Sequence, residues 1–245
     1  MSFDKNYFLS KISAVFKENG LHSMLNGKRS EQFLYLTEIM LEENEKYNLT
    51  AITDPDKIII NHYLDCAFLA RELPSDAAVA DVGCGAGFPT LPIAILRPDV
   101  KILGIDSTAK RTNYVSLAAE RLGLENVKTL TSRAEEAGAK PELRESFDCV
   151  VARAVAAMPI LTELCLPLVR RGGRFIAMKG KNALAELEDS KRAITTLGGR
   201  LLSCEDITLL GGEEQISHPL IVVEKASPTP AAYPRVYAKI LKKPL

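Results

Sequence analysis

Three glycines at alternate positions form the stretch of this chain best suited to holding a ligand. Gly83, Gly85 and Gly87 follow a short apolar run, residues 77–82, that is interrupted by Asp81. Such a run leading into a glycine loop, with a helical pattern behind it, predicts a buried strand that turns into a helix. Glycine accepts positive φ angles and has no Cβ to keep a ligand from the backbone. The free N–H groups and the positive dipole end of the following helix would face an anionic group.

The spacing of this loop separates two kinds of cofactor. A dinucleotide loop has its third glycine three residues after the second, where this chain has Phe88. The loop is therefore a better match to enzymes that use S-adenosylmethionine (SAM), and Asp81 is placed to hold the ammonium group of the methionine part. Asp106 lies 23 residues after Gly83 at the end of a second apolar run, where it could accept hydrogen bonds from ribose hydroxyls. The alternative is a tight turn, with Asp106 as a helix cap.

Alternating patterns from residue 77 onward predict the scaffold that positions these residues. Strand-like runs alternate with helical segments, which indicates an α/β fold with a doubly wound, mostly parallel sheet. The last two strands have no helix between them, so we expect a hairpin near Gly211 and an antiparallel strand at the sheet edge. Seven strands with the last one antiparallel is the layout of class I, Rossmann-like, SAM-dependent methyltransferases. The expected strands are 77–82, 100–105, 127–131, 147–152, 173–178, 200–209 and 220–224, and the expected helices are 90–96, 110–122, 158–169 and 183–197.

Ligands of open α/β sheets lie outside the carboxyl ends of the strands, so polar residues at those ends are candidate contacts. Ala134 and Glu135 follow the third strand and are placed to meet the adenine of SAM. Arg153 follows the fourth strand and could meet the SAM carboxylate or the substrate; a surface salt bridge is its alternative role. Lys179 follows the fifth strand.

Residues 1–75 are expected to form a helical extension before the SAM-binding domain, residues 76–225. Ser30 is a plausible helix N-cap, and another helix should open near Pro55. His62 would lie on that helix, three residues before Asp65 and on the same face. A structural role is more frequent than a catalytic one for such a histidine.

The last segment, residues 226–245, differs in composition from the rest. It carries four prolines, four basic residues, two tyrosines and no acidic residue. A tail of this kind can follow a phosphate backbone while its tyrosines stack on bases. A solvated, partly disordered terminus is the other interpretation.

Composition narrows the class of protein. The chain has 245 residues, 47% hydrophobic and 25% charged, and a formal net charge of zero, so any nucleic-acid site must be a local patch. No apolar run approaches the roughly 20 residues of a membrane span, and no signal-peptide core is present, so we expect a cytoplasmic protein without a membrane partner. The five cysteines form no CxxC pair, so we expect no metal. We also expect a monomer.

With these residues laid out, the chain closely resembles the bacterial glucose-inhibited division protein B family over residues 33–245. That family comprises SAM-dependent methyltransferases that modify guanine N7 in 16S ribosomal RNA. The resemblance implies that the partner is this RNA or the small ribosomal subunit, and that S-adenosylhomocysteine is the product. The motifs that carry it are KYNLTAIT (46–53), HYLDC (62–66), DVGCGAGFP (81–89), DSTAKR (106–111), RAE (133–135), ARAVA (152–156), AMKG (177–180), YPR (233–235) and KKPL (242–245).

The resemblance maps SAM contacts onto five of the residues above, including Phe88. Two departures stand out: Cys84 and Thr90 replace a more usual threonine and glycine, and VYAKILKKPL (236–245) replaces a segment with Gly-Thr-Pro. We expect the first to be harmless. The complete expected SAM-binding set is Asp81, Gly83, Gly85, Gly87, Phe88, Asp106, Ala134, Glu135 and Arg153.

The expected chemistry agrees with the residues present. Guanine N7 carries no proton, so its methylation requires alignment and exclusion of water rather than a general base. The place after the fourth strand lacks the Asn/Asp-Pro-Pro-aromatic motif of exocyclic-amine methyltransferases, and no cysteine fits a cytosine-C5 nucleophile. No catalytic residue is assigned; Arg153, Lys179 and Arg235 are candidates for holding guanine or phosphate. The alternatives are a SAM methyltransferase for a small molecule or protein, a non-catalytic ribosome assembly factor, and a nicotinamide-dependent oxidoreductase, against which Phe88 counts.

Overall fold

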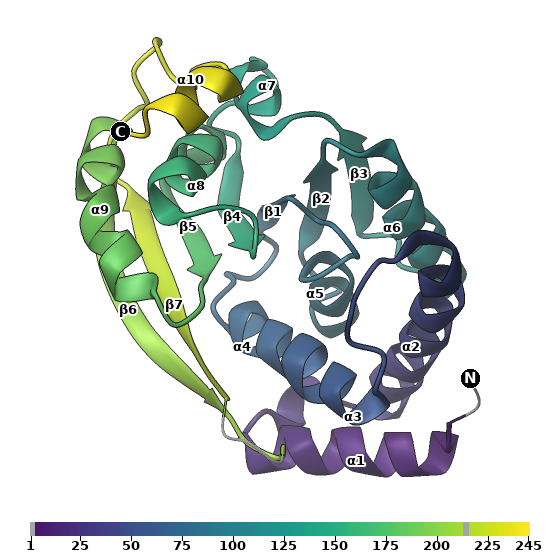
Figure 1. Ribbon diagram of the computed structural model, residues 1–245. Helices are drawn as coiled ribbons and strands as arrows, with labels where there is room; N and C mark the ends of the chain where they lie inside the picture. The colour runs from purple at the N-terminus through teal and green to yellow at the C-terminus, as the bar shows by residue number, and fades with distance from the viewer. Residues whose placement is uncertain (1–2, 213–215) are drawn as a thin grey trace.

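The computed structural model describes residues 3–212 and 216–245, which form a central sheet covered by helices on both faces (Figure 1). Within these residues seven strands lie in the order β3-β2-β1-β4-β5-β7-β6. Neighbouring strands from β3 to β5 are parallel, and β7 is antiparallel to both β5 and β6. The strands are β1 Ala78–Val82, β2 Lys101–Asp106, β3 Val127–Thr131, β4 Phe147–Arg153, β5 Val169–Met178, β6 Gly199–Leu209 and β7 Ile216–Lys225.

The expected doubly wound α/β fold with a mostly parallel sheet is confirmed, with one correction. The antiparallel strand is not at the edge: β7 lies between β5 and β6, and β6 is the edge strand. The hairpin pattern required only that β6 and β7 be neighbours. The crossover through α9 leaves one strand position open beside β5, and β7 turns back to fill it.

The helices follow the expected alternation, with three differences in detail. The second helix begins at Gly27 with Asn26 as its N-cap, whose side chain accepts a hydrogen bond from the Arg29 N–H, so Ser30 is not the cap. The helix expected over 158–169 ends at Cys165, because a 3₁₀ turn and then β5 follow it. Helices α7 and α10 were not predicted. The helices are α1 Lys5–Glu18, α2 Gly27–Tyr47, α3 Pro55–Ile58, α4 Asp65–Arg71, α5 Thr90–Leu96, α6 Ala109–Leu122, α7 Ala134–Ala139, α8 Met158–Cys165, α9 Ala183–Thr196 and α10 Tyr237–Lys242, with 3₁₀ turns at His22–Met24 and Leu166–Leu168 and a π-helical turn at Ile59–Leu64.

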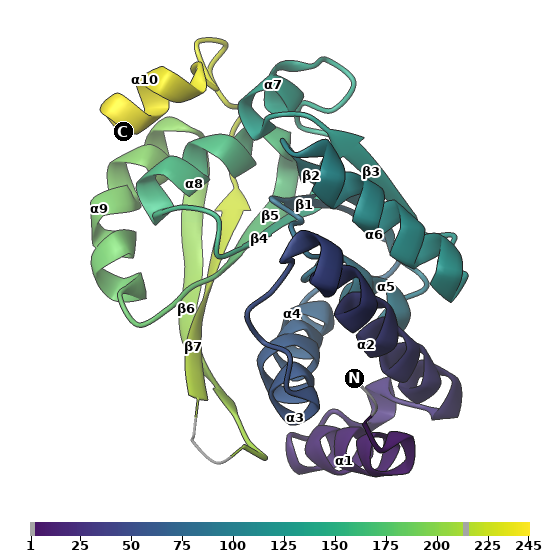
Figure 2. The same cartoon turned by 45° about the vertical axis from the view of Figure 1, so that its right-hand side comes forward.

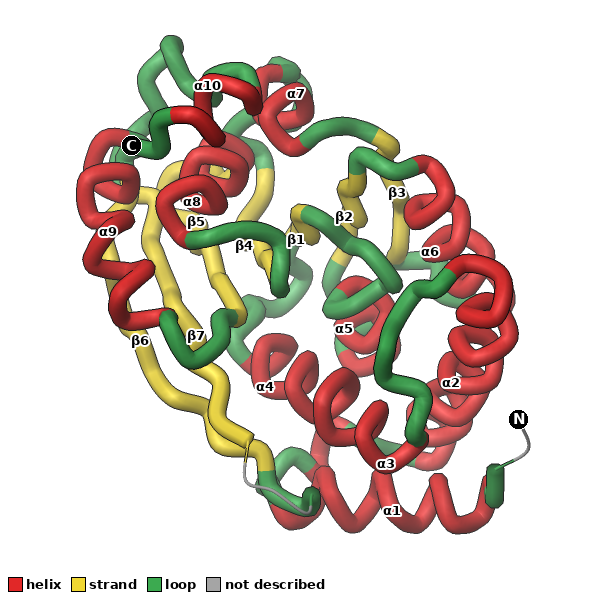
Figure 3. The backbone as a smooth tube through the Cα atoms, viewed as in Figure 1, coloured by secondary structure: helices red, strands yellow, loops and turns green. Residues whose placement is uncertain are grey.

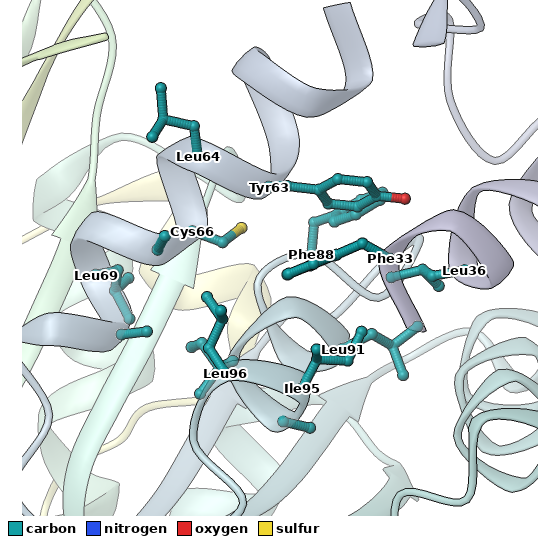
Figure 4. Close-up of a cluster of buried hydrophobic side chains, with 14 of the residues drawn as sticks. Phe33, Leu36, Tyr63, Leu64, Cys66, Leu69, Phe88, Leu91, Ile95 and Leu96 are labelled. Atoms are coloured by element: carbon teal, nitrogen blue, oxygen red, sulfur yellow. The ribbon is translucent and has the colours of Figure 1, made fainter. Parts of the chain in front are cut away.

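The N-terminal helices share a hydrophobic core with one face of the sheet. Phe33 of α2, Tyr63 of the π-helical turn and Phe88 of the glycine loop pack together within this cluster (Figure 4). The Tyr63 hydroxyl, fully buried, is satisfied by Thr37 Oγ1 at 2.7 Å. Helices α8 and α9 cover a second cluster on the opposite face. The division of the chain at residues 75 and 225 remains a prediction.

The far end of the β6–β7 hairpin reaches α1 (Figure 2). Asn19, the C-cap of α1, donates through Nδ2 to the Leu210 carbonyl and accepts from the Leu210 N–H through Oδ1, both at 3.0 Å. The hairpin is thereby tied to the N-terminal helices. No helix in the described residues is both long and apolar enough to cross a bilayer.

The C-terminal segment folds back against the rest of the protein and is held by specific contacts, although most of its residues are exposed to solvent. Arg144 donates to the carbonyls of Thr229 and Tyr233 at 2.8 Å. Arg235 forms an ion pair at 2.6 Å with Glu163, which is fully buried. Ile240 of α10 is also fully buried. These contacts bring α10 close to α7 and α8 (Figure 1).

Candidate active site

A cavity of about 560 Å³ opens at the carboxyl ends of strands β1 to β4. Val82, Asp106, Ser132 and Arg153, at or just beyond the ends of four successive strands of the chain, all contribute to its wall. The connection from α2 to α3, drawn in green in Figure 3, adds Leu49 and Thr50. The other lining residues are His62, Gly83, Gly85, Ala86, Phe88, Ile105, Ser107, Arg111, Arg133, Ala134, Glu135, Ala154, Val155, Ala156, Leu164 and Tyr237.

The three glycines of the loop serve different purposes. All have positive φ angles, between 50° and 83°. A Cβ on Gly83 would lie 2.5 Å from Val155, and one on Gly87 would lie 2.5 Å from Leu91, so both positions are closed by protein. Gly87 does not line the cavity. Gly85 does, and a Cβ there would meet only the Gly83 carbonyl oxygen at 3.7 Å, so it would project into space that a ligand could use.

Asp81 lies beneath this loop rather than in the cavity wall. Its side chain is fully buried, and its Oδ2 accepts hydrogen bonds from the N–H and the hydroxyl of Thr90. Burial raises the pKa of Asp81 to about 6, although the two hydrogen bonds from Thr90 oppose the shift. Thr90 engages only Oδ2, and Oδ1 has no partner among the described residues, so the expected contact of this carboxylate with an ammonium group stays a prediction. Thr90, expected to be a harmless replacement of glycine, has a defined role.

Asp106 lines the cavity at the end of β2 and supports the loop. Its Oδ2 accepts from the Gly85 N–H at 3.1 Å and lies 3.4 Å from Arg111 Nη1, while Oδ1 accepts from the Thr108 N–H at 2.9 Å. The carboxylate is 5% exposed. Its orientation is thus fixed by backbone donors, and its remaining lone pairs can accept from a diol in the cavity.

Residues after β3 form a second polar wall with the C-terminal helix. Arg133 Nε donates to Glu135 at 2.7 Å, and the guanidinium lies 4.4 Å from the centre of the Tyr237 ring. Ala134 and Glu135, at the start of α7, line the cavity as expected. Tyr237 was not predicted. The sequence indicated only that the tyrosines of the tail could stack on bases, which placed neither of them in the cavity.

A cluster of side chains around Arg153 forms another part of the cavity wall. The Arg153 guanidinium donates to the Asn61 carbonyl at 3.0 Å, to Asp65 at 3.2 Å and to His62 Nδ1 at 2.8 Å. The ring of His62 stacks on Phe88 with centroids 4.2 Å apart. Burial and the Arg153 charge lower the pKa of His62 to about 3, whereas burial raises the pKa of Asp65 against the pull of Arg153. Arg153 therefore belongs to a largely buried ion pair and also lines the cavity.

The other two substrate-holding candidates lie outside the cavity wall. Lys179 pairs with Glu186 at 2.6 Å and donates to the Ala156 carbonyl. Arg235 is held by Glu163, as described for the tail. Both side chains have structural contacts in this arrangement. In the described part of the chain, no group of three or more His, Cys, Asp or Glu residues is placed to hold a metal ion, and the five cysteines are free thiols.

Comparison with known proteins shows the family to which this chain belongs. The model of the GidB family, rRNA small subunit methyltransferase G, matches residues 29–214. The chain belongs to this family. A ribosomal RNA small subunit methyltransferase G from Clostridium perfringens is 46% identical over 222 residues, 90% of this chain and 92% of the relative. The corresponding protein of Desulfitobacterium hafniense is 42% identical over 226 residues, 92% and 93% of the two chains.

Solved structures with low sequence identity share the fold. The branched-chain polyamine synthase of Thermus thermophilus aligns with a TM-score of 0.56 and 14% identity, covering 80% of this chain and 64% of that one. TYW2 of M. jannaschii, solved in complex with AdoMet (SAM), aligns with a TM-score of 0.51 and 16% identity, covering 65% of this chain and 73% of that one. These alignments, together with the strand order, confirm the expected class I methyltransferase fold.

The residues of the cavity fit SAM. Gly85 leaves room against the backbone, Asp106 offers acceptors for a ribose, and Ala134 and Glu135 lie in the wall where the adenine was expected. Arg153 uses three N–H donors on protein acceptors, so a guanidinium with five has two left for a carboxylate or a base. These individual contacts remain predictions.

Proposed function

We propose that this chain transfers the methyl group of SAM to N7 of a guanine in the 16S RNA of the small ribosomal subunit. Family membership supports the class of substrate, because the relatives are named as methyltransferases of ribosomal RNA of the small subunit. The cavity supports the choice of atom.

The distribution of acids in the cavity wall carries the choice of N7. Among the described lining residues the carboxylates are Asp106 and Glu135, and both are engaged on the side expected for ribose and adenine. His62, which also lines the cavity, has a pKa of about 3 and is a weak base. A nitrogen that carries no proton can be methylated there without a general base.

The chain's own residues would act by positioning. SAM supplies a methyl group bonded to a positively charged sulfur. Asp106 would fix the ribose, Ala134 and Glu135 the adenine, and Arg153 the carboxylate or the substrate. The apolar surfaces of Phe88 and Val155, both in the wall, would exclude water from the reacting atoms. Alignment of a nucleophile with the methyl group accounts for a large part of such catalysis.

Labelling of small-subunit RNA tests the proposal. Small subunits and bare 16S RNA are isolated from cells that lack this protein, incubated with the enzyme and methyl-labelled SAM, and digested to nucleosides for mass analysis. We expect labelled 7-methylguanosine from at least one of the two substrates, and no label with enzyme carrying Asp106→Ala. Label in another nucleoside would contradict the choice of N7, and no label in either RNA would contradict the proposal as a whole.

A further inference from the structure

The imidazole of His62 is a built element of the cavity wall. It is 5% exposed, lines the cavity beside Thr50, and stacks on Phe88 with an interplanar angle of 21°. Arg153 holds its other edge through the 2.8 Å contact with Nδ1. The stacking on Phe88 fixes the plane of the ring, and the contact with Arg153 fixes its rotation within that plane.

The contact with Arg153 determines where the proton of His62 lies. A guanidinium has only donors, so Nδ1 presents a lone pair to it. The Asn61 carbonyl also lies 3.1 Å from Nδ1, but it accepts a hydrogen bond from Arg153 Nη1 at 3.0 Å and needs no proton from the ring. The ring is neutral because burial and the neighbouring positive charge disfavour the charged form. Its one proton is consequently on Nε2.

The Nε2–H group is poorly satisfied within the protein. Its recorded contact is with Thr50 Oγ1 at 3.4 Å, which is long for a hydrogen bond to an oxygen. A buried donor with so weak a partner is costly unless a ligand supplies an acceptor. Since both His62 and Thr50 line the cavity, a ligand bound there can supply it.

We propose that Nε2–H of His62 donates a hydrogen bond to O6 of the guanine that is methylated. This inference rests on the proposed function. Guanine presents two acceptors on one edge, N7 and O6, so a donor on O6 leaves N7 as the free lone pair. Adenine presents an N–H₂ donor at the position of O6, which would face Nε2–H donor to donor. His62 would thus both position the base and select guanine over adenine.

Two nearly isosteric substitutions separate the role of Nε2 from that of the rest of the ring. The amide nitrogen of His62→Gln can occupy the position of Nε2, whereas the amide of His62→Asn reaches only the position of Nδ1. Both lose the stacking on Phe88. Labelling of wild-type substrate first locates the target nucleotide, and small subunits with adenine at that nucleotide provide the competitor.

We expect His62→Asn to reduce kcat/KM for the guanine substrate by about 10- to 100-fold and to reduce the preference for guanine over adenine by a similar factor, since one buried hydrogen bond is lost. His62→Gln should retain more of both. The Kd for SAM, measured by calorimetry, should change less than threefold in both variants, which also shows that each is folded.

Three results would overturn the inference. One is an unchanged guanine preference in His62→Asn, and another is equal losses in the two variants. The third is a loss confined to SAM affinity, which would place the Nε2–H group on the cofactor carboxylate. Failure of the wild-type enzyme to label a guanine would instead contradict the proposed function, so the two failures are distinguishable.

Discussion

Thr90 holds the carboxylate of Asp81 from the first turn of α5, donating to the same oxygen from its backbone N–H at 3.2 Å and from its hydroxyl. Both side chains are fully buried, and the second carboxylate oxygen has no partner within the described residues. The contact ties the helix to β1 directly beneath the glycine loop. Glycine, the residue that the resemblance led us to expect at position 90, could supply only the backbone donor.

Replacing Thr90 with valine should destabilise the protein. The substitution keeps the volume and branching but removes the hydroxyl donor from a buried carboxylate, at a cost of about 1–3 kcal/mol in the free energy of unfolding. Urea unfolding of wild-type, Thr90→Val and Thr90→Ser measures it, and the serine variant should retain most of the stability. Equal stability of all three would show that the hydroxyl contributes nothing.

Asp81 should make stability depend on pH in a defined direction. Its pKa is raised to about 6, above the ordinary value of 3.8 for an aspartate, so the folded protein binds this proton more tightly than the unfolded chain. The contribution is therefore stabilising below about pH 4 and is lost as the pH rises through 6. Asp106, whose charge also raises this pKa, and Arg153, whose charge lowers it, are the charged neighbours involved.

Comparison with Asp81→Asn separates the contribution of Asp81 to the pH dependence of stability from the contributions of other titrating groups. The unfolding free energy of the variant relative to wild type should increase by on the order of 3 kcal/mol between pH 4 and 7.5, in the absence of SAM. Urea unfolding at four or five pH values across this range provides the curve. A difference that stays constant with pH would mean that Asp81 titrates alike in both states.

The strand ends were predictable because the sheet repeats one rule. Val82, Asp106 and Arg153 end β1, β2 and β4, which are neighbouring parallel strands of the sheet. The carboxyl ends of such strands lie at one edge, so the sequence predicts that these residues are close together. The same rule could not place Asp81. It precedes the end of β1 by one residue, and alternation along the strand directs its side chain beneath the loop.

Contacts between distant segments could not be read from local patterns. Lys179 and Arg235 looked like free cations in sequence, because nothing local shows that Glu186 and Glu163 reach them. Tyr237 lines the cavity because the tail folds back toward α7 and α8, held by the Arg235–Glu163 ion pair and by hydrogen bonds from Arg144 to backbone carbonyls, which no local sequence pattern reveals. Long-range pairing of charges was the missing information.

Gly85 should be the loop glycine on which cofactor affinity depends most directly. Gly85→Ala places a methyl group in the cavity, and we expect the Kd for SAM and S-adenosylhomocysteine to rise at least tenfold by calorimetry. Gly123→Ala is a matched control, since Gly123 also has a positive φ, 65°, with nothing within 4 Å of a Cβ. Both variants should lose about 1 kcal/mol of stability from backbone strain. Similar cofactor affinities in the two would contradict the assignment of the loop.

The exposed lysines of the C-terminal segment should contribute to RNA affinity. Lys242 ends α10 and Lys243 is its C-cap; both are exposed, and α10 lies at the end of the molecule opposite α1 (Figure 1). Changing both to glutamine should weaken binding to small-subunit RNA and reduce the slope of log K against log salt by about 1–2, with the Kd for SAM unchanged. Lys5→Gln, on α1, is the control and should change neither quantity. An unaltered slope in the double variant would place the RNA elsewhere.

Tyr237 should strengthen cofactor binding through Arg133. Its ring lies 4.4 Å from the Arg133 guanidinium, whose Nε is held by Glu135, so the aromatic face fixes a side chain that is otherwise 45% exposed at the adenine side of the cavity. Cation–π contacts of this kind are worth about 0.5–2 kcal/mol. Tyr237→Ala should therefore raise the Kd for SAM by about 2- to 30-fold, while Tyr237→Phe, which keeps the aromatic face, should raise it much less. Leu241→Ala, at a 56% exposed position of the same helix, controls for a general weakening of α10. In a double-mutant cycle with Arg133→Ala, additive losses would show that the two side chains act independently.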